Sequence, residues 1–169
     1  MGRLRMAAGA GAVALVAALT AIVAAQGPYD KLLTAADVEK VAGVTGVKTV
    51  PNGSQVGAGG MLNFVNSSGK LILAVSFGDG QLYRKARDTK ELEIGGKKYP
   101  NLLFAHSVPG IGDEAFASPP GPVQYVIYAR KGDHGIAVNT FYPGAGEHVK
   151  PLLTEAQLKT IAQLIFTRE

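Results

Sequence analysis

The sequence predicts an α+β protein in which an antiparallel β-sheet is flanked by an N-terminal and a C-terminal helix. Three observations indicate this class: capped helical patterns near both ends of the chain, alternating apolar and polar residues between them, and turn sequences that join consecutive alternating runs. Consecutive hairpins form an antiparallel sheet, and helices are needed to cover its apolar face.

The first 25 residues form a separate segment. Arg3 and Arg5 precede an uncharged, apolar run from Met6 to Ala25, which ends in small residues. A basic start, an apolar middle and a small-residue exit are typical of a signal peptide, so we expect export and cleavage after Ala25. The alternative is an uncleaved N-terminal membrane anchor, because about twenty apolar residues can span a bilayer.

Residues 26–169 are then expected to form a single α+β domain that is periplasmic or secreted. Removal of the two leader arginines from the 17 basic residues leaves 15 against 13 acidic ones, a net charge of +2. This balance gives no indication of nucleic acid as a partner. The chain has no cysteine, which excludes disulfides, a thiol nucleophile and thiolate metal ligands.

Two capping boxes mark the terminal helices. Thr34 stands three residues before Asp37, and Thr154 stands three residues before Gln157. In each pair the hydroxyl can accept from a backbone amide of the first turn, while the second side chain bonds back to the cap. The apolar residues that follow at helical spacing are Val38, Val41 and Ala42 in the first helix and Leu158, Ile161, Ala162 and Ile165 in the second.

Between these helices the periodicity changes to that of strands. One predicted hairpin joins residues 61–65 to 71–77, and another joins 123–130 to 136–141 through a turn at 131–135. Gly95-Gly96 predicts the turn of a shorter pair around 92–94 and 98–99. We also expect a strand over 102–108, a short surface helix over 81–90 and a long connection over 44–60.

The stretch VPGIGDEAF, residues 108–116, places two adjacent carboxylates, Asp113 and Glu114, behind a Gly-rich turn. Adjacent acids rarely reach one bond from opposite sides, as glycoside hydrolysis requires, and two carboxylates alone do not complete a calcium or magnesium site. We therefore interpret the stretch as a loop whose proline and glycines shape the backbone while Asp113 binds nearby amides. A binding or catalytic role for the two acids stays open.

The remaining candidates are weaker. His106, His134 and His148 lack ligand spacing, and the chain has neither a GxSxG elbow nor a phosphate loop. No residue is therefore predicted to be catalytic, to ligate a metal or to hold a cofactor. Tyr128 and Arg130 fall on the less apolar face of their strand, where they could line a ligand groove or simply pack across strands.

A basic cluster lies on the predicted surface helix: Arg84, Lys85, Arg87 and Lys90. It could make a peripheral contact with a membrane or another anionic envelope surface, or it could be a solvated helix face.

Three motifs resemble a group of uncharacterised bacterial envelope proteins, found especially among actinobacterial secreted proteins and lipoproteins: LLTAADVEKVAG at 32–43, PGIGDEA at 109–115 and ARKGD at 129–133. The resemblance implies a PsbP-like α-β-α sandwich and no established catalytic residues. Many relatives carry a lipobox cysteine or a cysteine pair, and this chain has neither. Its lack of cysteine therefore indicates a free periplasmic or secreted form.

These observations favour an exported, non-enzymatic, envelope-associated module that binds a protein partner or a small ligand through Asp113, Glu114, Tyr128 and Arg130. One alternative is an exported hydrolase or metal-dependent enzyme that uses Asp113, Glu114 and His106. The other is a protein that docks on anionic envelope surfaces through the basic cluster. These patterns identify neither the ligand nor the partner, and they give no oligomeric state.

Overall fold

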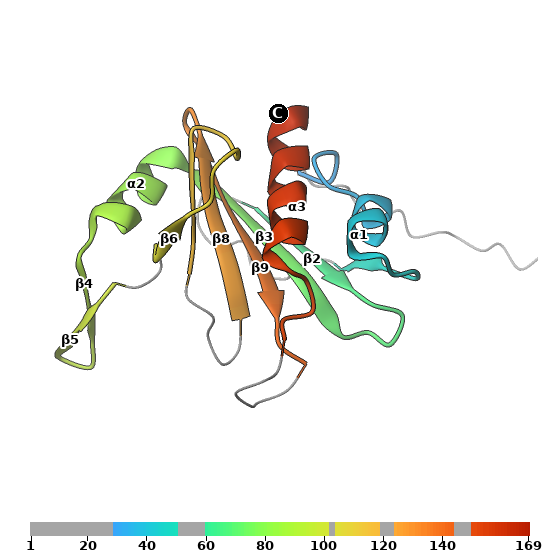
Figure 1. Cartoon of the computed structure of the whole chain (residues 1–169), viewed down its shortest axis with the longest axis horizontal. Helices are drawn as coiled ribbons and strands as arrows, with labels where there is room; N and C mark the ends of the chain where they lie inside the picture. The colour runs from blue at the N-terminus through green and yellow to red at the C-terminus, as the bar shows by residue number, and fades with distance from the viewer. Residues whose placement is uncertain (1–28, 51–59, 102–103, 119–123, 144–149) are drawn as a thin grey trace, which may run out of the picture.

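An antiparallel β-sheet forms the centre of the protein (Figure 1). The computed structural model describes residues 29–50, 60–101, 104–118, 124–143 and 150–169. The leader predicted for residues 1–25 lies outside these ranges. Within them, no helix is long and apolar enough to cross a bilayer.

Seven strands of the described ranges make up the sheet, in the spatial order β1-β2-β3-β9-β8-β7-β6, and each pair is antiparallel. The strands are β1 (Lys48–Val50), β2 (Met61–Val65), β3 (Leu71–Asp79), β6 (His106–Ser107), β7 (Glu114–Ala117), β8 (Gln124–Lys131) and β9 (His134–Phe141). A separate ribbon consists of β4 (Glu91–Ile94) and β5 (Lys97–Pro100). The helices are α1 (Ala35–Ala42), α2 (Gly80–Asp88) and α3 (Glu155–Arg168). The predicted α+β class and antiparallel sheet are confirmed.

The three predicted hairpins are present. Gly95 and Gly96 have φ values of 60° and 75°, as a two-residue turn of type I′ requires. The β8–β9 turn is tighter than expected, because β9 already begins at His134 and only Gly132 and Asp133 form the loop. The positive φ of 57° at Gly132 permits this tight turn.

The structure differs from the expected strands at three places. β1 lies inside the expected connection 44–60, and β7 begins inside VPGIGDEAF. Each is very short, so alternation over three or four residues gives little signal against a Gly-rich background. The strand expected over 102–108 is only the two-residue β6 within the described residues, since residues 102–103 lie outside them.

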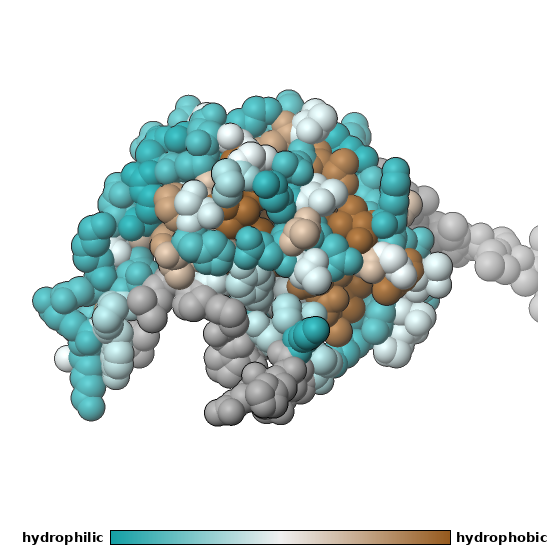
Figure 2. Space-filling model, in the orientation of Figure 1, coloured by the Kyte–Doolittle hydropathy of each residue, from teal (hydrophilic) through white to brown (hydrophobic). Residues whose placement is uncertain are grey.

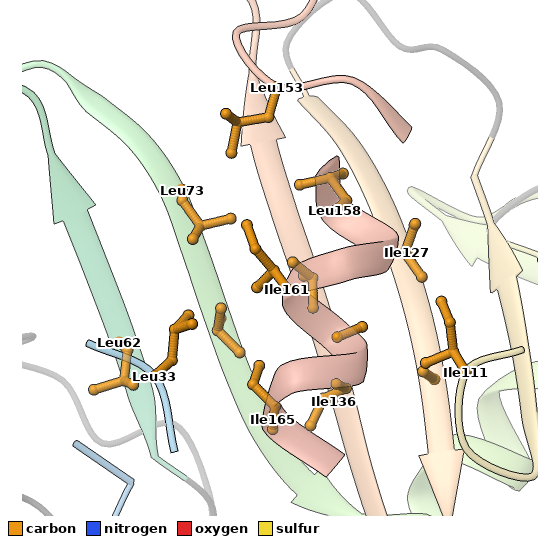
Figure 3. Close-up of a cluster of buried hydrophobic side chains, with 14 of the residues drawn as sticks. Leu33, Leu62, Leu73, Ile111, Ile127, Ile136, Leu153, Leu158, Ile161 and Ile165 are labelled. Carbon is orange, nitrogen blue, oxygen red and sulfur yellow. The ribbon is translucent and has the colours of Figure 1, made fainter. Parts of the chain in front are cut away.

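Helices α1 and α3 lie on the same face of the sheet, which we call the helical face (Figure 1). Gln157 of α3 ties them together, because its Nε2 donates to the main-chain oxygen of Val41 at 3.1 Å. Figure 3 shows branched aliphatic side chains of α3 and of the strands filling the space between them, with Leu158, Ile161 and Ile165 fully buried. Burying these chains removes apolar surface from water and is the main source of stability.

Helix α2 contacts the opposite face of β8 and β9, which we call the back face. Side chains alternate between the two faces along each strand. Ala115 of β7 and Ala129 of β8 therefore point into the main core, while their neighbours Glu114 and Arg130 point to the back face.

Candidate functional site

The Gly-rich stretch at 108–112 packs tightly against the body of the protein. Val108 and Ile111 are buried in the main core. Gly112 has a φ of 53°, and a Cβ placed there would lie 2.3 Å from the main-chain oxygen of Arg130. The amide of Asp113 donates to that same oxygen at 2.8 Å. This geometry supports the interpretation of the stretch as a backbone-shaping loop, and strand β7 begins at Glu114.

Both carboxylates of VPGIGDEAF bind Arg130. Asp113 Oδ2 accepts from the Gly132 amide at 2.8 Å and from Arg130 Nη1 at 3.1 Å. Glu114 lies opposite Arg130 in the β7–β8 register and accepts from its Nε at 2.9 Å. Arg87 of α2 donates to the other oxygen of Glu114. Glu114 therefore connects α2 to two strands of the sheet.

These contacts determine the charge of Glu114. Burial raises the pKa of the carboxyl, but hydrogen bonds from Arg130 and Arg87 lower it by more, so its pKa lies below the ordinary value of 4.5. Side chains of Glu114 and Arg130 are only 20% and 16% exposed. An ionised carboxylate held between two guanidinium groups is poorly suited to donate a proton near neutral pH.

Aromatic rings lie beside this ion-pair network on the back face. Phe116 of β7 and Tyr128 of β8 lie opposite each other. Each is two residues along its strand from Glu114 or Arg130 and therefore lies on the same face as that residue. The ring of Phe104 lies across both, with centroid distances of 5.9 Å to Phe116 and 5.0 Å to Tyr128. All three rings are half-buried. We call Phe104, Phe116 and Tyr128 the aromatic shelf.

Tyr83 of α2 closes one side of the shelf by meeting Phe104 edge-on at 5.6 Å. The residue is only 7% exposed, and its hydroxyl is buried without a hydrogen-bond partner among the described residues. Burial, and then the charge of Glu114, raise the pKa of Tyr83, so the phenol stays protonated and remains a donor. An unsatisfied buried hydroxyl costs about 1–3 kcal/mol, so few native structures retain one without a reason.

Sequence reasoning identified Asp113, Glu114, Tyr128 and Arg130 as candidate contacts, and the structure places all four at the β7–β8 end of the back face. It did not identify Phe104 and Phe116 as members of the aromatic shelf, and it did not identify Tyr83 as part of the site. One signal was available: the four-residue spacing of Tyr83 and Arg87 places both on one side of a helix. The role of Phe104 depends on tertiary structure and has no local signal.

The histidines lie apart from these carboxylates. His106 Nε2 is 3.0 Å from Glu155 Oε2, to which the Tyr125 hydroxyl also donates, and Tyr125 belongs to the helical face. His134 begins β9, and His148 lies outside the described residues. No described group of three or more histidine, aspartate or glutamate side chains could hold a metal ion. The arrangement proposed for a hydrolase, with His106 beside Asp113 and Glu114, is not formed.

The basic cluster divides into two pairs of residues. Arg87 binds Glu114 and Asp88, and Arg84 Nη2 lies 3.7 Å from Asp133 Oδ1. The other two members, Lys85 and Lys90, are exposed and form no ion pair with any residue in the described ranges. The arginines therefore hold α2 on the sheet, while the lysines face solvent.

A shallow hollow of about 370 Å³ lies between the Gly-rich loop and the C-terminal end of α3. Its lining residues are Gly110, Gly112, Lys131, Gln163, Phe166 and Thr167. Lys131 Nζ donates to the Phe166 carbonyl at 2.6 Å, and Gln163 Nε2 donates to the Gly110 carbonyl at 2.7 Å. The first bond joins the end of β8 to the helix and the second joins the Gly-rich loop to it, which gives the hollow a structural role.

No protein-family model matches the chain, and neither a curated protein nor a solved structure reaches the similarity that counts as a match. The family suggested by the three sequence motifs therefore stays a prediction.

Proposed function

We propose that the protein is an exported, non-enzymatic, envelope-associated module that binds a small ligand or a protein partner on its back face. The observation that supports this proposal is the buried Tyr83 hydroxyl, which has no hydrogen-bond partner in the described ranges and lies beside the half-buried aromatic shelf. A flat apolar group packed on the shelf would bury ring surface, and an acceptor on it would satisfy the phenol.

The charged groups support binding more than catalysis. Asp113 and Glu114 are both hydrogen-bonded to Arg130, and the histidine that an acid–base mechanism would use lies on the other face. General acid–base catalysis needs a group within hydrogen-bond reach of the reacting atom and with a pKa near the working pH. Glu114, whose pKa lies below its ordinary value, does not meet the second condition.

The finer fold and the location belong to the same proposal. Helices α1 and α3 on one face and α2 on the other are compatible with a PsbP-like α-β-α sandwich. The basic, apolar and small-residue order of the first 25 residues supports export with cleavage after Ala25, or alternatively an N-terminal anchor.

The test expresses the full-length chain with its leader and recovers it from the envelope and the medium for native mass spectrometry. We expect a chain that begins at Gln26 and retains a non-covalent molecule or protein. Tyr83→Phe should lose that molecule. It should also unfold at a higher urea concentration than the ligand-free wild type, because it removes a buried hydroxyl that is unsatisfied without the ligand. Tyr99→Phe is the matched control, since Tyr99 is 46% exposed and lies on the ribbon.

Two outcomes would contradict the proposal. One is a wild-type protein that carries nothing under any purification condition while Tyr83→Phe behaves identically. The other is a catalytic turnover that disappears in Asp113→Ala while the circular dichroism spectrum is unchanged.

A further inference from the structure

The β4–β5 ribbon stands apart from the rest of the structure. Its strands pair only with each other in the described part of the chain, and every residue of β5 is exposed. Figures 1 and 2 show the ribbon projecting from the body at the lower left. An isolated two-stranded ribbon is marginally stable in water, and none of the ribbon side chains that the structure describes belongs to the main core. Core packing therefore does not explain its presence.

The two faces of the ribbon carry different charges. The pairing extends one residue beyond the strands, because the Asn101 amide donates to the Lys90 carbonyl at 2.9 Å. With the observed register, alternation places Lys90, Leu92, Lys97 and Tyr99 on one face and Glu91, Glu93, Lys98 and Pro100 on the other. We call the first the lysine–tyrosine face. Both acidic residues of the ribbon lie on the opposite face, where Glu91 pairs with Lys98 at 3.3 Å.

The side chains of the lysine–tyrosine face suit the surface of a bilayer. Tyr99 is 46% exposed and lies directly opposite the partly exposed Leu92. A tyrosine ring combines an apolar body with a polar tip and favours the membrane–water interface. Lysines near an anionic lipid surface each strengthen binding about fivefold. Lys90 and Lys97 stand two residues before Leu92 and Tyr99 on the same face, and Lys85 of α2 is a further exposed cation nearby in sequence.

We propose that the lysine–tyrosine face docks on an anionic lipid bilayer. A stable protein interface buries about 800 Å² on each partner, far more than one face of two four-residue strands provides. Bilayer docking needs only a few inserted side chains and a favourable surface charge. The contact differs from the sequence-based expectation, because Arg84 and Arg87 are engaged in ion pairs and the ribbon lysines replace them. It is independent of the back-face site.

The absence of cysteine allows a direct test of this geometry. Single variants Tyr99→Cys and Glu93→Cys are labelled with the environment-sensitive fluorophore bimane, in the full-length chain. Vesicles of phosphatidylglycerol and phosphatidylcholine are the probe, and pure phosphatidylcholine vesicles are the control. We expect a blue shift at position 99 only, since the label at 93 lies on the opposite face. The leader is the same in both variants, so its own insertion affects both labels equally.

Salt and charge reversal provide the second measurement. Raising NaCl to about 0.5 M should abolish the shift, because the Debye length falls to a few ångströms. In the Tyr99→Cys background, Lys90→Glu with Lys97→Glu should weaken the apparent vesicle affinity at least about tenfold. Lys98→Glu is the matched control on the other face and should change the affinity about twofold or less.

Several results would overturn the proposal: equal shifts at positions 93 and 99, equal responses to neutral and anionic vesicles, or no response to either. A concentration-dependent dimer abolished by Tyr99→Asp, without any vesicle response, would instead assign the ribbon to a second copy of the chain. Capture of an acidic protein by the lysine–tyrosine face, again without a vesicle response, would assign it to that partner.

Discussion

At the scale of single residues, Gly112 marks the place where the loop of VPGIGDEAF passes closest to another strand. The oxygen of Arg130 occupies the space that a side chain at this position would need, and the neighbouring amide of Asp113 donates to it. The glycine is therefore required for two reasons, its left-handed φ and the close backbone approach.

We predict that Gly112→Ala lowers the free energy of unfolding by about 3 kcal/mol or more, because the obstacle is a main-chain carbonyl that cannot rotate away. Gly69→Ala is the matched control. Gly69 also has a positive φ, of 78°, but a Cβ there meets no atom within 4 Å. It should lose only about 1–2 kcal/mol, the cost of a left-handed alanine. Urea denaturation followed by circular dichroism measures both values, and equal losses would show that the close approach is not limiting.

The ion-pair network was only partly accessible to sequence reasoning. Adjacent acids at 113–114 and a basic helix were visible as separate features. Their connection depends on the β7–β8 register, which places Glu114 opposite Arg130, and on α2 crossing the back face to bring in Arg87. A one-residue change of register would turn Glu114 to the other face, so no local pattern encodes the contact.

At the scale of helices and strands, the capping boxes were the most informative local signals. The hydroxyl of Thr154 accepts from the Gln157 amide, and the Gln157 side chain bonds back to the amide of Thr154 at 2.8 Å. The same glutamine also donates to the last turn of α1, at the carbonyls of Val41 and Ala42. Gln157 therefore both caps its own helix and binds the neighbouring one.

This double role predicts an unusual response to Gln157→Glu. Glutamate is a good partner in a capping box, so the sequence alone predicts no loss of stability. In the structure the new carboxylate would lose both bonds to α1 and would face carbonyl oxygens at the negative end of that helix. We expect the free energy of unfolding to fall by about 1–3 kcal/mol.

Gln81→Glu is the control for this substitution, because Gln81 is exposed in the first turn of α2 and its side chain makes no hydrogen bond to another helix within the described ranges. It should change stability by less than about 0.5 kcal/mol. A Gln157→Glu protein as stable as the wild type would show that the bonds to α1 contribute little.

Strand prediction succeeded where alternation was long and failed where it was short. The hairpins β2–β3 and β8–β9 carry alternating apolar residues on both sides of a turn sequence. Strands β1 and β7 have three and four residues, and their position in the sheet depends on pairing with neighbours. The placement of α1 and α3 on the same face is likewise a tertiary result, set by the apolar sides of both helices meeting one core.

At the scale of the whole molecule, one ion pair joins the two helices at the ends of the described chain. Both nitrogens of the Arg168 fork bind the Asp37 carboxylate, at 2.6 and 2.7 Å. Hydrogen bonds from Arg168, with those from Thr34, hold the pKa of Asp37 well below its ordinary value of 3.8 despite the opposing effect of burial. The folded state therefore favours the ionised carboxyl.

This lowered pKa predicts the direction of the acid response. A carboxyl with a lower pKa in the folded than in the unfolded state stabilises the protein above the unfolded value, and the stability is lost as the pH falls. Glu114 and Glu155 have lowered pKa values and add to the effect. We expect these carboxyls to make the free energy of unfolding decline as the pH falls below about 4.5.

Asp37→Asn should make that decline in the free energy of unfolding about 1–2 kcal/mol smaller. The effect is less than the full pKa shift of Asp37 implies, because Arg168 is 36% exposed and solvent screens the ion pair. Glu93→Gln, an exposed carboxyl on the ribbon, is the control and should leave the curve unchanged. Urea denaturation at a series of pH values gives both profiles. Parallel profiles for wild type and Asp37→Asn would show that the pair contributes no pH dependence.

The strand order has a consequence for biosynthesis. Strands β1 to β3 and strands β6 to β9 are two separate meanders, and among the strands that the structure describes only the pairing of β3 with β9 joins them. The residues of β3 are mostly apolar, and one of its hydrogen-bonding edges is covered by β9. In a chain synthesised from its N-terminus, this edge therefore stays unpaired until residues 134–141 have been made. A nascent chain with such an unpaired edge is prone to aggregate, so rapid pairing of β9 with β3 protects the newly made protein from aggregation.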